Sequence, residues 1–340
     1  MSDAASTESI QLPVLDSVLY GAAKAFDYLG MRGQDMLDKV GEGILDYSTK
    51  KGFIKRVDDP QQFAFGIVAF FKNNGYVADL DFTQDSEIIT ITMRGWDYLP
   101  LLSRLRNQNC FLLSCPLCLA NNSFRRQISV GWKAINERVT EDGDYTVQFK
   151  VVPPSARANV PPEPYNMNAV KADSNRGKRI GLPVFEATEY GLALAFDYLG
   201  AQAQLLLDSV GSGAVEFLES ELHLQLPKNH RKSLQELSSF YTQGGLADKI
   251  DVDLSDSKMK VAFTNYRYAP VLERLLDEGY RLTSCPFTLA ARAVLRNAGF
   301  AATNMEWKVL NDRNAEMKMD LRIAGQEFDE DKIGRIMENV

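Results

Sequence analysis

Residues 25–30 read Ala-Phe-Asp-Tyr-Leu-Gly, and residues 195–200 read the same six letters. The offset between these two stretches is 170, and at the same offset Ser114-Cys115-Pro116 returns as Ser284-Cys285-Pro286. Chance composition does not hold one constant offset over such a length, so the matches indicate an internal duplication. The sequence therefore predicts one domain that is present twice.

The duplication divides the chain into four parts. We expect copy one at residues 12–152, a linker at 153–181, copy two at 182–324 and an acidic tail at 325–340. The linker holds five prolines and few large apolar side chains, a composition that does not build a core. Five basic residues against two acidic ones give it a charge of +3, so it either docks on an acidic surface or is a solvated tether.

Length and composition exclude several classes of protein. The chain has 340 residues, of which 45% are apolar and 24% charged, and this suits a soluble protein of two domains. A net charge of −7 argues against nucleic acid as the main partner. The longest apolar run, 63–71, is too short for a membrane span, although peripheral membrane contact stays open. The start is polar and the four cysteines are too few for a disulfide framework, so we expect a cytoplasmic protein.

Each copy begins with a helical pattern. Apolar residues at 37, 40, 44 and 47 form one stripe of a helix, and the stripe recurs at 207, 210, 214 and 217. Gly41 and Gly43 lie beside the stripe, as Gly211 and Gly213 do in copy two. Because glycine destabilises a helix interior, these positions predict close approach of another backbone. Residues 15–29 form an earlier helix that ends at Gly30, and 60–72 form a third.

The period then changes from that of a helix to that of a strand. Alternating residues in 76–82 and 89–93 predict a hairpin with one buried face, and copy two repeats it at 250–254 and 259–263. Two helices follow, of which the second opens at Ser-Cys-Pro, and a strand pair at 130–139 and 145–151 closes the domain. The fold class predicted is α+β, with an N-terminal helical layer packed on an antiparallel sheet in each copy.

This order of elements resembles one known superfamily. The motifs that carry the resemblance are Tyr20-Gly21, the run Leu37-Asp38-Lys39-Val40-Gly41, the hairpin and Cys115 at a helix start. The chain is similar to the 4-vinyl reductase (hydrocarbon-binding) domains, the TRAPP vesicle-tethering subunits and the haem-based nitric oxide sensors. The resemblance covers nearly all of both copies.

The resemblance implies a ligand-binding module that pairs through its N-terminal helices. Relatives hold a hydrophobic molecule, an acyl chain or a tetrapyrrole between helices and sheet. Two copies in one chain would then form an intramolecular pseudo-dimer. The chain lacks the cysteine of acylated TRAPP subunits, which place it before the third helix. It also lacks the zinc-binding cysteines of phenol sensors in the closing strands, so that zinc site is expected to be absent and no residue is assigned as a metal ligand.

The cysteines allow three interpretations. Cys110, Cys115 and Cys118 have the spacing of plant-type iron–sulfur ligands, with Cys285 as a fourth. Alternatively, Cys115 and Cys285 are buried apolar residues at helix starts. In the third interpretation they line a pocket, and the helix N-terminus lowers the thiol pKa.

Features present in both copies are the candidates for a shared site. We expect Phe26 and Tyr28, with Phe196 and Tyr198, to line a pocket for a planar ligand, together with Cys115 and Cys285. The same motifs are also compatible with core packing. The aromatic residues after the hairpin (Trp96, Tyr98, Tyr266 and Tyr268) are expected at an exposed interface or a pocket rim.

Common enzyme signatures are missing from the sequence, including the Walker loop, the dinucleotide fingerprint and the zinc-protease and hydrolase motifs. We therefore expect a non-catalytic module that holds a hydrophobic or tetrapyrrole-like molecule and presents it to partner proteins. The alternative is an assembly or scaffold protein that acts through protein contacts without a ligand. By resemblance, photosystem or pigment–protein assembly is a possible setting for either.

Overall fold

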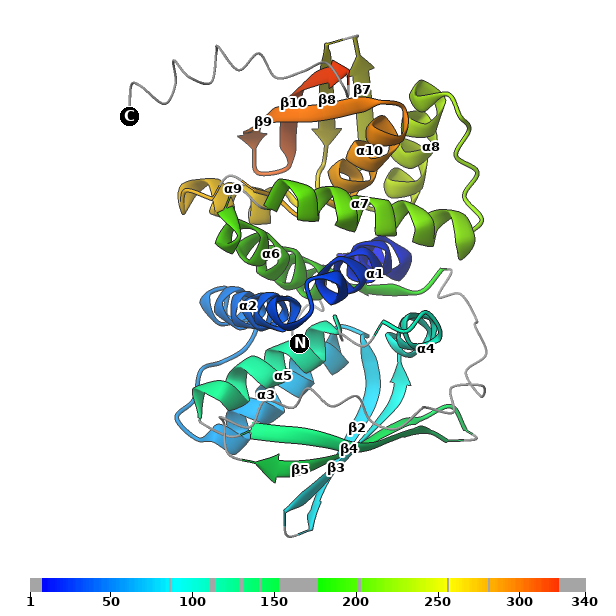
Figure 1. Cartoon of the computed structure of the whole chain (residues 1–340). Coiled ribbons are helices and arrows are strands. Elements are labelled where there is room, and N and C mark those ends of the chain that lie inside the picture. Colours follow the sequence, from blue (N-terminus) through cyan, green and yellow to red (C-terminus); the bar gives the residue numbers. More distant parts are fainter. Residues whose placement is uncertain are drawn as a thin grey trace, which may run out of the picture.

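The fold is that of a computed structural model of the chain. It describes residues 8–85, 87–110, 114–128, 131–140, 142–152, 177–200, 203–255, 257–280 and 282–323. Two α+β units lie at opposite ends of the molecule, and their first helices meet in the middle (Figure 1). The predicted fold class is confirmed.

The two copies contain the same elements in the same order. Copy one has α1 (Leu12–Tyr28), α2 (Met31–Lys50), α3 (Pro60–Asn73), β2 (Val77–Asp85), β3 (Ile88–Trp96), α4 (Leu99–Asn107), α5 (Pro116–Gln127), β4 (Gly131–Val139) and β5 (Tyr145–Val152). Copy two has α6 (Leu182–Tyr198), α7 (Ala203–Ser220), α8 (His230–Gln243), β7 (Lys249–Leu254), β8 (Lys258–Thr264), α9 (Ala269–Asp277), α10 (Pro286–Asn297), β9 (Phe300–Asn311) and β10 (Asn314–Ile323).

Each copy builds one four-stranded antiparallel sheet. The strand order is β2-β3-β5-β4 in copy one and β7-β8-β10-β9 in copy two. In both sheets the hairpin pairs with the closing strands through its second strand. None of the described helices is long and apolar enough to cross a membrane.

Local sequence accounts for the helix boundaries. The side chains of Asp59 and Asn229 cap α3 and α8 by accepting a hydrogen bond from the main-chain N–H of the third residue of each helix. Gly30 and Gly200 follow the ends of α1 and α6 with φ of 57° and 55°. Glycine adopts this left-handed conformation without strain, so both helices end where the repeated motif ends.

The segments outside the two copies are described only in part. The predicted linker 153–181 lies outside the described residues as far as 176, and the whole of the predicted acidic tail 325–340 lies outside them. The last three linker residues form a strand, β6 (Arg179–Gly181), which pairs with β1 (Ser9–Gln11). The linker prediction missed this strand because three residues are too few to show a period.

A pseudo-twofold axis relates the copies. In the antiparallel pair of β1 and β6, Ile10 lies opposite Ile180, and these two residues are themselves one offset of 170 apart. The axis therefore passes between them. On either side of it α1 packs against α7, and α2 packs against α6 (Figure 1).

Glycines allow the helices to pack this closely. A Cβ atom at Gly21 would lie 2.1 Å from the carbonyl oxygen of Val210, and one at Gly191 would lie 2.4 Å from that of Val40. A Cβ at Gly43 would lie 2.6 Å from the Cα of Gly191. A Cβ at Gly41 would lie 2.3 Å from the carbonyl oxygen of Leu119 in α5. The predicted close backbone approach at the paired glycines is confirmed.

The repeated Leu-Asp motif has a structural role within each copy. Asp38 in α2 accepts a hydrogen bond of 3.0 Å from Asn122 in α5. In copy two, Arg292 in α10 donates to Asp208 at 2.7 Å. The aspartate thus joins α2 to α5 in copy one and α7 to α10 in copy two.

Replacing Gly43 by alanine tests the helix contact. The new methyl group would meet the backbone of α6, so we expect Gly43→Ala to lower the free energy of unfolding by about 1–3 kcal/mol. Gly66→Ala is the matched control, because its methyl group finds only ordinary contact and alanine favours a helix by about 1 kcal/mol. Urea unfolding of both variants measures this. Equal stability changes of the two variants would contradict close packing at Gly43.

Candidate functional site

The Ser-Cys-Pro turn lies at the centre of each copy. The Ser114 hydroxyl donates to the carbonyl of Leu19 at 2.8 Å, and Ser284 donates to the carbonyl of Glu189 at 2.6 Å. The phenol oxygen of Tyr98 accepts from the Ser114 N–H, and Tyr268 accepts from the Ser284 N–H. Because each serine hydroxyl already donates its hydrogen to a main-chain carbonyl, the tyrosine hydroxyl is the donor to the serine oxygen. The turn therefore joins the first helix of each copy to the helix that the turn begins.

The repeated cysteines lie inside this turn and are fully buried. The sulfur of Cys115 accepts a hydrogen bond from the N–H of Cys118 at 3.5 Å. Cys285 accepts a hydrogen bond of 2.8 Å from the Tyr266 hydroxyl. Burial raises the pKa of Cys285 to about 11. This is opposite to the lowered thiol pKa of the third interpretation, which is wrong for Cys285 because burial outweighs the helix N-terminus.

The four cysteines do not come together as cluster ligands. Cys110 and Cys115 are buried and Cys118 is half-buried in copy one, whereas Cys285 begins α10 of copy two. Among the described residues, no group of three His, Cys, Asp or Glu side chains has the arrangement of a metal site.

The Phe-Asp-Tyr motifs lie at the pseudo-twofold axis. Phe26 and Phe196 are fully buried and face each other with ring centres 6.3 Å apart. Tyr28 and Tyr198 point outward instead, with 92% and 63% of their surface exposed. Lys39 of copy one lies over the Tyr198 ring at 5.5 Å. The structure thus brings the phenylalanines together, but it places the tyrosines on the surface.

The aromatic residues after the hairpin belong to the core. Trp96, Tyr98, Tyr266 and Tyr268 are each at most 4% exposed. The expectation of an exposed interface or a pocket rim was wrong, because these side chains pack behind the Ser-Cys-Pro turn. Tyr98 and Tyr268 hold that turn by the bonds described above.

Three buried positions carry a more polar side chain in copy two than in copy one. Glu189, Tyr241 and Tyr266 stand where copy one has Leu19, Phe71 and Trp96. All of these side chains are buried. Within the described residues, neither carboxylate oxygen of Glu189 has a hydrogen-bond partner.

Burial raises the pKa of two glutamates on α6. The pKa of Glu189 rises to about 8, although the nearby Ser284 opposes the rise. The pKa of Glu186 rises to about 7, and the Tyr47 hydroxyl of copy one donates to it at 3.1 Å. At neutral pH Glu189 is therefore mostly protonated, and an uncharged carboxyl is much less costly to bury than a carboxylate.

The space between helices and sheet is filled differently in the two copies. In copy two, Trp307 on β9 lies parallel to Tyr266 at 6.3 Å and stacks on Phe263 at 5.7 Å. The corresponding residue in copy one is Glu137 on β4. One oxygen of Glu137 is inaccessible and has no hydrogen-bond partner among the described residues. In copy one Tyr145, which stands where copy two has Ala315, packs on Trp96 with ring centres 4.9 Å apart.

Strand register places Glu137 on the inner face of the sheet. Ile91, Val147 and Glu137 lie opposite one another on three neighbouring strands, and Val147 is 3% exposed. The equivalent row in copy two is Val261, Met317 and Trp307. Ile91 and Phe149 are half-buried, whereas their copy-two equivalents Val261 and Met319 are at most 1% exposed.

Polar groups of α5 face this row. The guanidinium of Arg125 lies over the Phe149 ring at 5.9 Å. The thiol of Cys118 has a raised pKa, first through its bond with Cys115 and through burial, and the charge of Glu137 contributes. We call the set Ile91, Cys118, Arg125, Glu137 and Phe149 the copy-one seam. It combines apolar walls with a partly buried carboxylate and a guanidinium.

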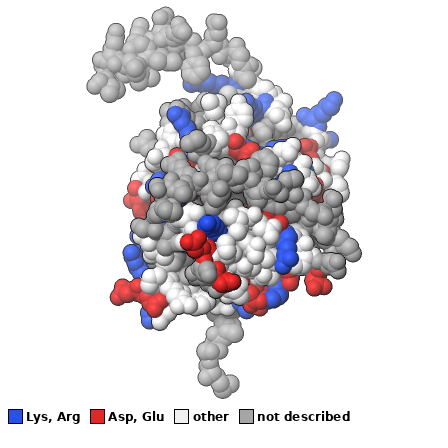
Figure 2. Space-filling model, turned by 60° about the horizontal axis from the view of Figure 1, so that its bottom comes forward, with Lys and Arg blue, Asp and Glu red and all other residues white. Residues whose placement is uncertain are grey.

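A separate hollow of about 490 Å³ lies on the outer face of the second sheet. Its lining alternates between lysines such as Lys258 and Lys318 and acidic residues such as Asp253 and Glu306. None of the predicted site residues lies there. On the face of the molecule shown in Figure 2, basic and acidic side chains are also interspersed. Mixed charge of this kind is typical of a solvated surface.

Sequence reasoning missed Glu189, Glu137 and Trp307. The signal was available, since the offset of 170 places Glu189 against Leu19 in an apolar helix and Trp307 against Glu137 in a strand. The candidates for a shared site were residues present in both copies, and these positions differ between the copies. The structure locates both differences in the interior.

Searches against known protein families, curated proteins and solved structures found no match to this chain.

The buried carboxyl of Glu189 makes stability depend on pH. Its folded pKa of about 8 exceeds the ordinary value of 4.5, so folding takes up a proton between these values. Stability from this group is complete below pH 4.5 and is lost as pH rises through 8. We expect Glu189→Leu, which restores the copy-one residue, to be at least about 2 kcal/mol more stable than the wild type at pH 8.

Denaturant unfolding from pH 5 to pH 9 measures this effect, with the flatter profile expected for Glu189→Leu. Glu219→Leu is the control, because Glu219 is exposed on α7 and its loss should leave the pH profile unchanged. A Glu189→Leu profile parallel to that of the wild type would show that the carboxyl is not buried unpaired.

Proposed function

We propose that the chain is a non-catalytic binding module in which copy one holds a hydrophobic or tetrapyrrole-like small molecule. The binding site is the copy-one seam, between α5 and the inner face of the sheet. Copy two serves as the closed partner that completes the pseudo-dimer. The molecule would be presented to partner proteins.

The contrast between the two interiors carries this proposal. The same row of the sheet is closed by the Trp307 indole in copy two and holds Glu137 in copy one. Half-buried Ile91 and Phe149 offer apolar contact to a ligand, and each fully covered apolar side chain contributes roughly 1.5–3 kcal/mol. A carboxylate oxygen without a partner is costly inside a protein, and a ligand with a hydrogen-bond donor would satisfy it.

The resemblance to hydrocarbon-binding and tetrapyrrole-binding domains supports the same position for a ligand, because relatives hold theirs between helices and sheet. Apolar side chains also extend to the surface around the seam. Phe82 on β2 is 47% exposed and Ile135 on β4 is 45% exposed. An apolar rim of this kind is typical of the entrance to a site for an apolar molecule.

A scaffold that acts through protein contacts is the second candidate, and one observation favours it. The motif at residues 25–30 is identical in both copies, and a structural role explains its phenylalanine and its glycine. Tyr28 and Tyr198 are identical as well, yet both are exposed on either side of the axis. Exposed tyrosines are frequent anchors of protein interfaces.

Binding to the seam is tested with the full chain and a neutral fluorescent probe such as Nile red. Ile91→Trp places a large ring in the seam, so we expect probe affinity to fall at least about ten-fold. Gln148→Trp is the control, because Gln148 lies on the opposite face of the same sheet, where it bonds to Thr90. This variant should bind as the wild type does.

The native ligand is sought in the absorption spectrum and the denaturing mass spectrum of the purified protein. A pigment or lipid that is lost in Ile91→Trp would support the proposal. A colourless protein without a bound molecule, in which Ile91→Trp and Gln148→Trp take up the probe equally, would contradict it. Capture of partner proteins by such an empty chain would favour the scaffold.

A further inference from the structure

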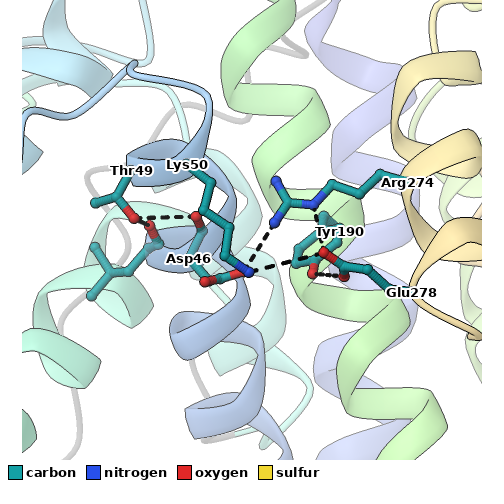
Figure 3. A network of polar contacts seen from close by, with 7 residues as sticks. Asp46, Thr49, Lys50, Tyr190, Arg274 and Glu278 are labelled. Atoms are coloured by element: carbon teal, nitrogen blue, oxygen red, sulfur yellow. Dashed lines mark hydrogen bonds and ion pairs between the residues drawn. The ribbon is translucent and has the colours of Figure 1, made fainter.

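The contacts between the copies are pseudo-symmetric in position but not in charge. On one side of the axis, Arg274 of α9 donates to Asp46 of α2 at 3.2 Å, and Lys50 lies beside both Asp46 and Glu278 (Figure 3). On the other side, Lys24 bonds to Glu216 at 2.5 Å. Asp46 and Glu216 are equivalent acids, but Lys24 and Lys50 stand where copy two has Leu194 and Ser220, so the two sides differ in their lysines.

The clearest difference lies next to the β1–β6 pair. Glu8, before β1, accepts two hydrogen bonds from Arg313 of copy two, at 2.8 and 2.7 Å. These bonds and the charge of Arg267 lower the pKa of Glu8. The equivalent residue before β6 is Lys178, and it bonds to Asp97 of copy one. Asp97 is itself the equivalent of Arg267. Both ion pairs therefore cross the axis with opposite polarity.

Pairing of like copies would bring like charges together at this place. Two copies one would place Glu8 of each against Asp97 of the other, without an arginine, because the equivalent of Arg313 is Gly143. A pair of two copies two would place Lys178 of each against Arg313 and against Arg267, which is paired with Asp248 of its own copy. Juxtaposed like charges at an interface are unfavourable and reject wrong partners.

Two further contacts favour the mixed pair. Arg104 of copy one pairs with Glu221 of copy two, and in a pair of copies one it would meet Lys51 instead. The buried carboxyl of Glu186 receives its hydrogen bond from Tyr47 of copy one. In a pair of copies two it would meet Phe217, which has no donor. Each like pair thus carries two unfavourable contacts, and each occurs twice by symmetry.

We propose that this interface selects a copy two as the partner of a copy one, and that the charges at positions 8, 97, 178 and 267 make the selection. The apolar helix faces alone would permit any pairing of these related copies. Like pairing cannot close within one chain, because each chain has only one copy of each kind. It needs at least two chains, and alternating like contacts can also extend to longer assemblies. When copy one pairs with copy two, all contacts are satisfied within one chain, or within two chains that exchange their second copies.

The test uses the full chain with a protease site inserted within residues 153–176. The folded protein is cut, unfolded in denaturant and refolded, and native mass spectrometry counts the three kinds of pair by mass. For the wild type we expect like pairs to make up less than about a tenth of all pairs. Like pairs in statistical proportion would overturn the proposal.

The double variant Asp97→Arg with Lys178→Glu isolates the charge pattern. It keeps an ion pair at every mixed contact, but it gives both halves an acid at the first position and an arginine at the second. All three pairings are then allowed, so like pairs should rise at least about three-fold. Lys260→Glu with Glu316→Lys is the control, because it reverses an ion pair of 3.3 Å on the outer sheet face and should leave the ratio unchanged.

A second variant, Glu8→Lys with Arg267→Asp, gives both halves a lysine and an acid at the same two positions. This variant leaves the buried Asp97 unchanged, so its result does not depend on how well an arginine packs at that position. Uncut variant chains should also form larger oligomers on refolding at high concentration, which the wild type should not. A folded variant of either kind that keeps the wild-type pair ratio would overturn the proposal.

Discussion

The close contact of four helices across the pseudo-twofold axis is the constraint on which the rest of the structure depends. Backbone meets backbone at Gly21, Gly43, Gly191 and Gly213, where even a methyl group would not fit. The contact covers the apolar stripes of α2 and α7, which a single copy would leave in water. It also holds the two sheets at opposite ends of the molecule (Figure 1).

With one copy stacked against the other, the two interiors have diverged in different directions. Copy two closes its sheet face with the Trp307 indole and buries the carboxyl of Glu189 on α6. Copy one places Glu137 and Arg125 beside a half-buried sheet face. One copy thus has the features of a stable support and the other those of a binding site, which is the basis of the proposed function.

The sequence predicted the fold well, for reasons that lie in the repeat. The offset of 170 predicted two similar halves, which contain the same elements in the same order, and the paired glycines of α2 and α7 predicted the close backbone contact. The candidate site was harder to predict. Phe26 and Tyr28 are two positions apart on a helix, so they point in different directions, and only Phe26 reaches the axis. Glu189 looked like an ordinary helix residue, because sequence alone does not tell which face of a central helix is covered.

Cross-linking at the axis tests the central claim most directly. Ile10 and Ile180 lie opposite each other in the antiparallel β1–β6 pair, so their Cα atoms are close enough for a disulfide. In the double variant Ile10→Cys with Ile180→Cys, mild oxidation followed by peptide mapping should find the two peptides joined within a single chain. Joined peptides found only between chains, or two free thiols after oxidation, would contradict an intramolecular pseudo-twofold pair.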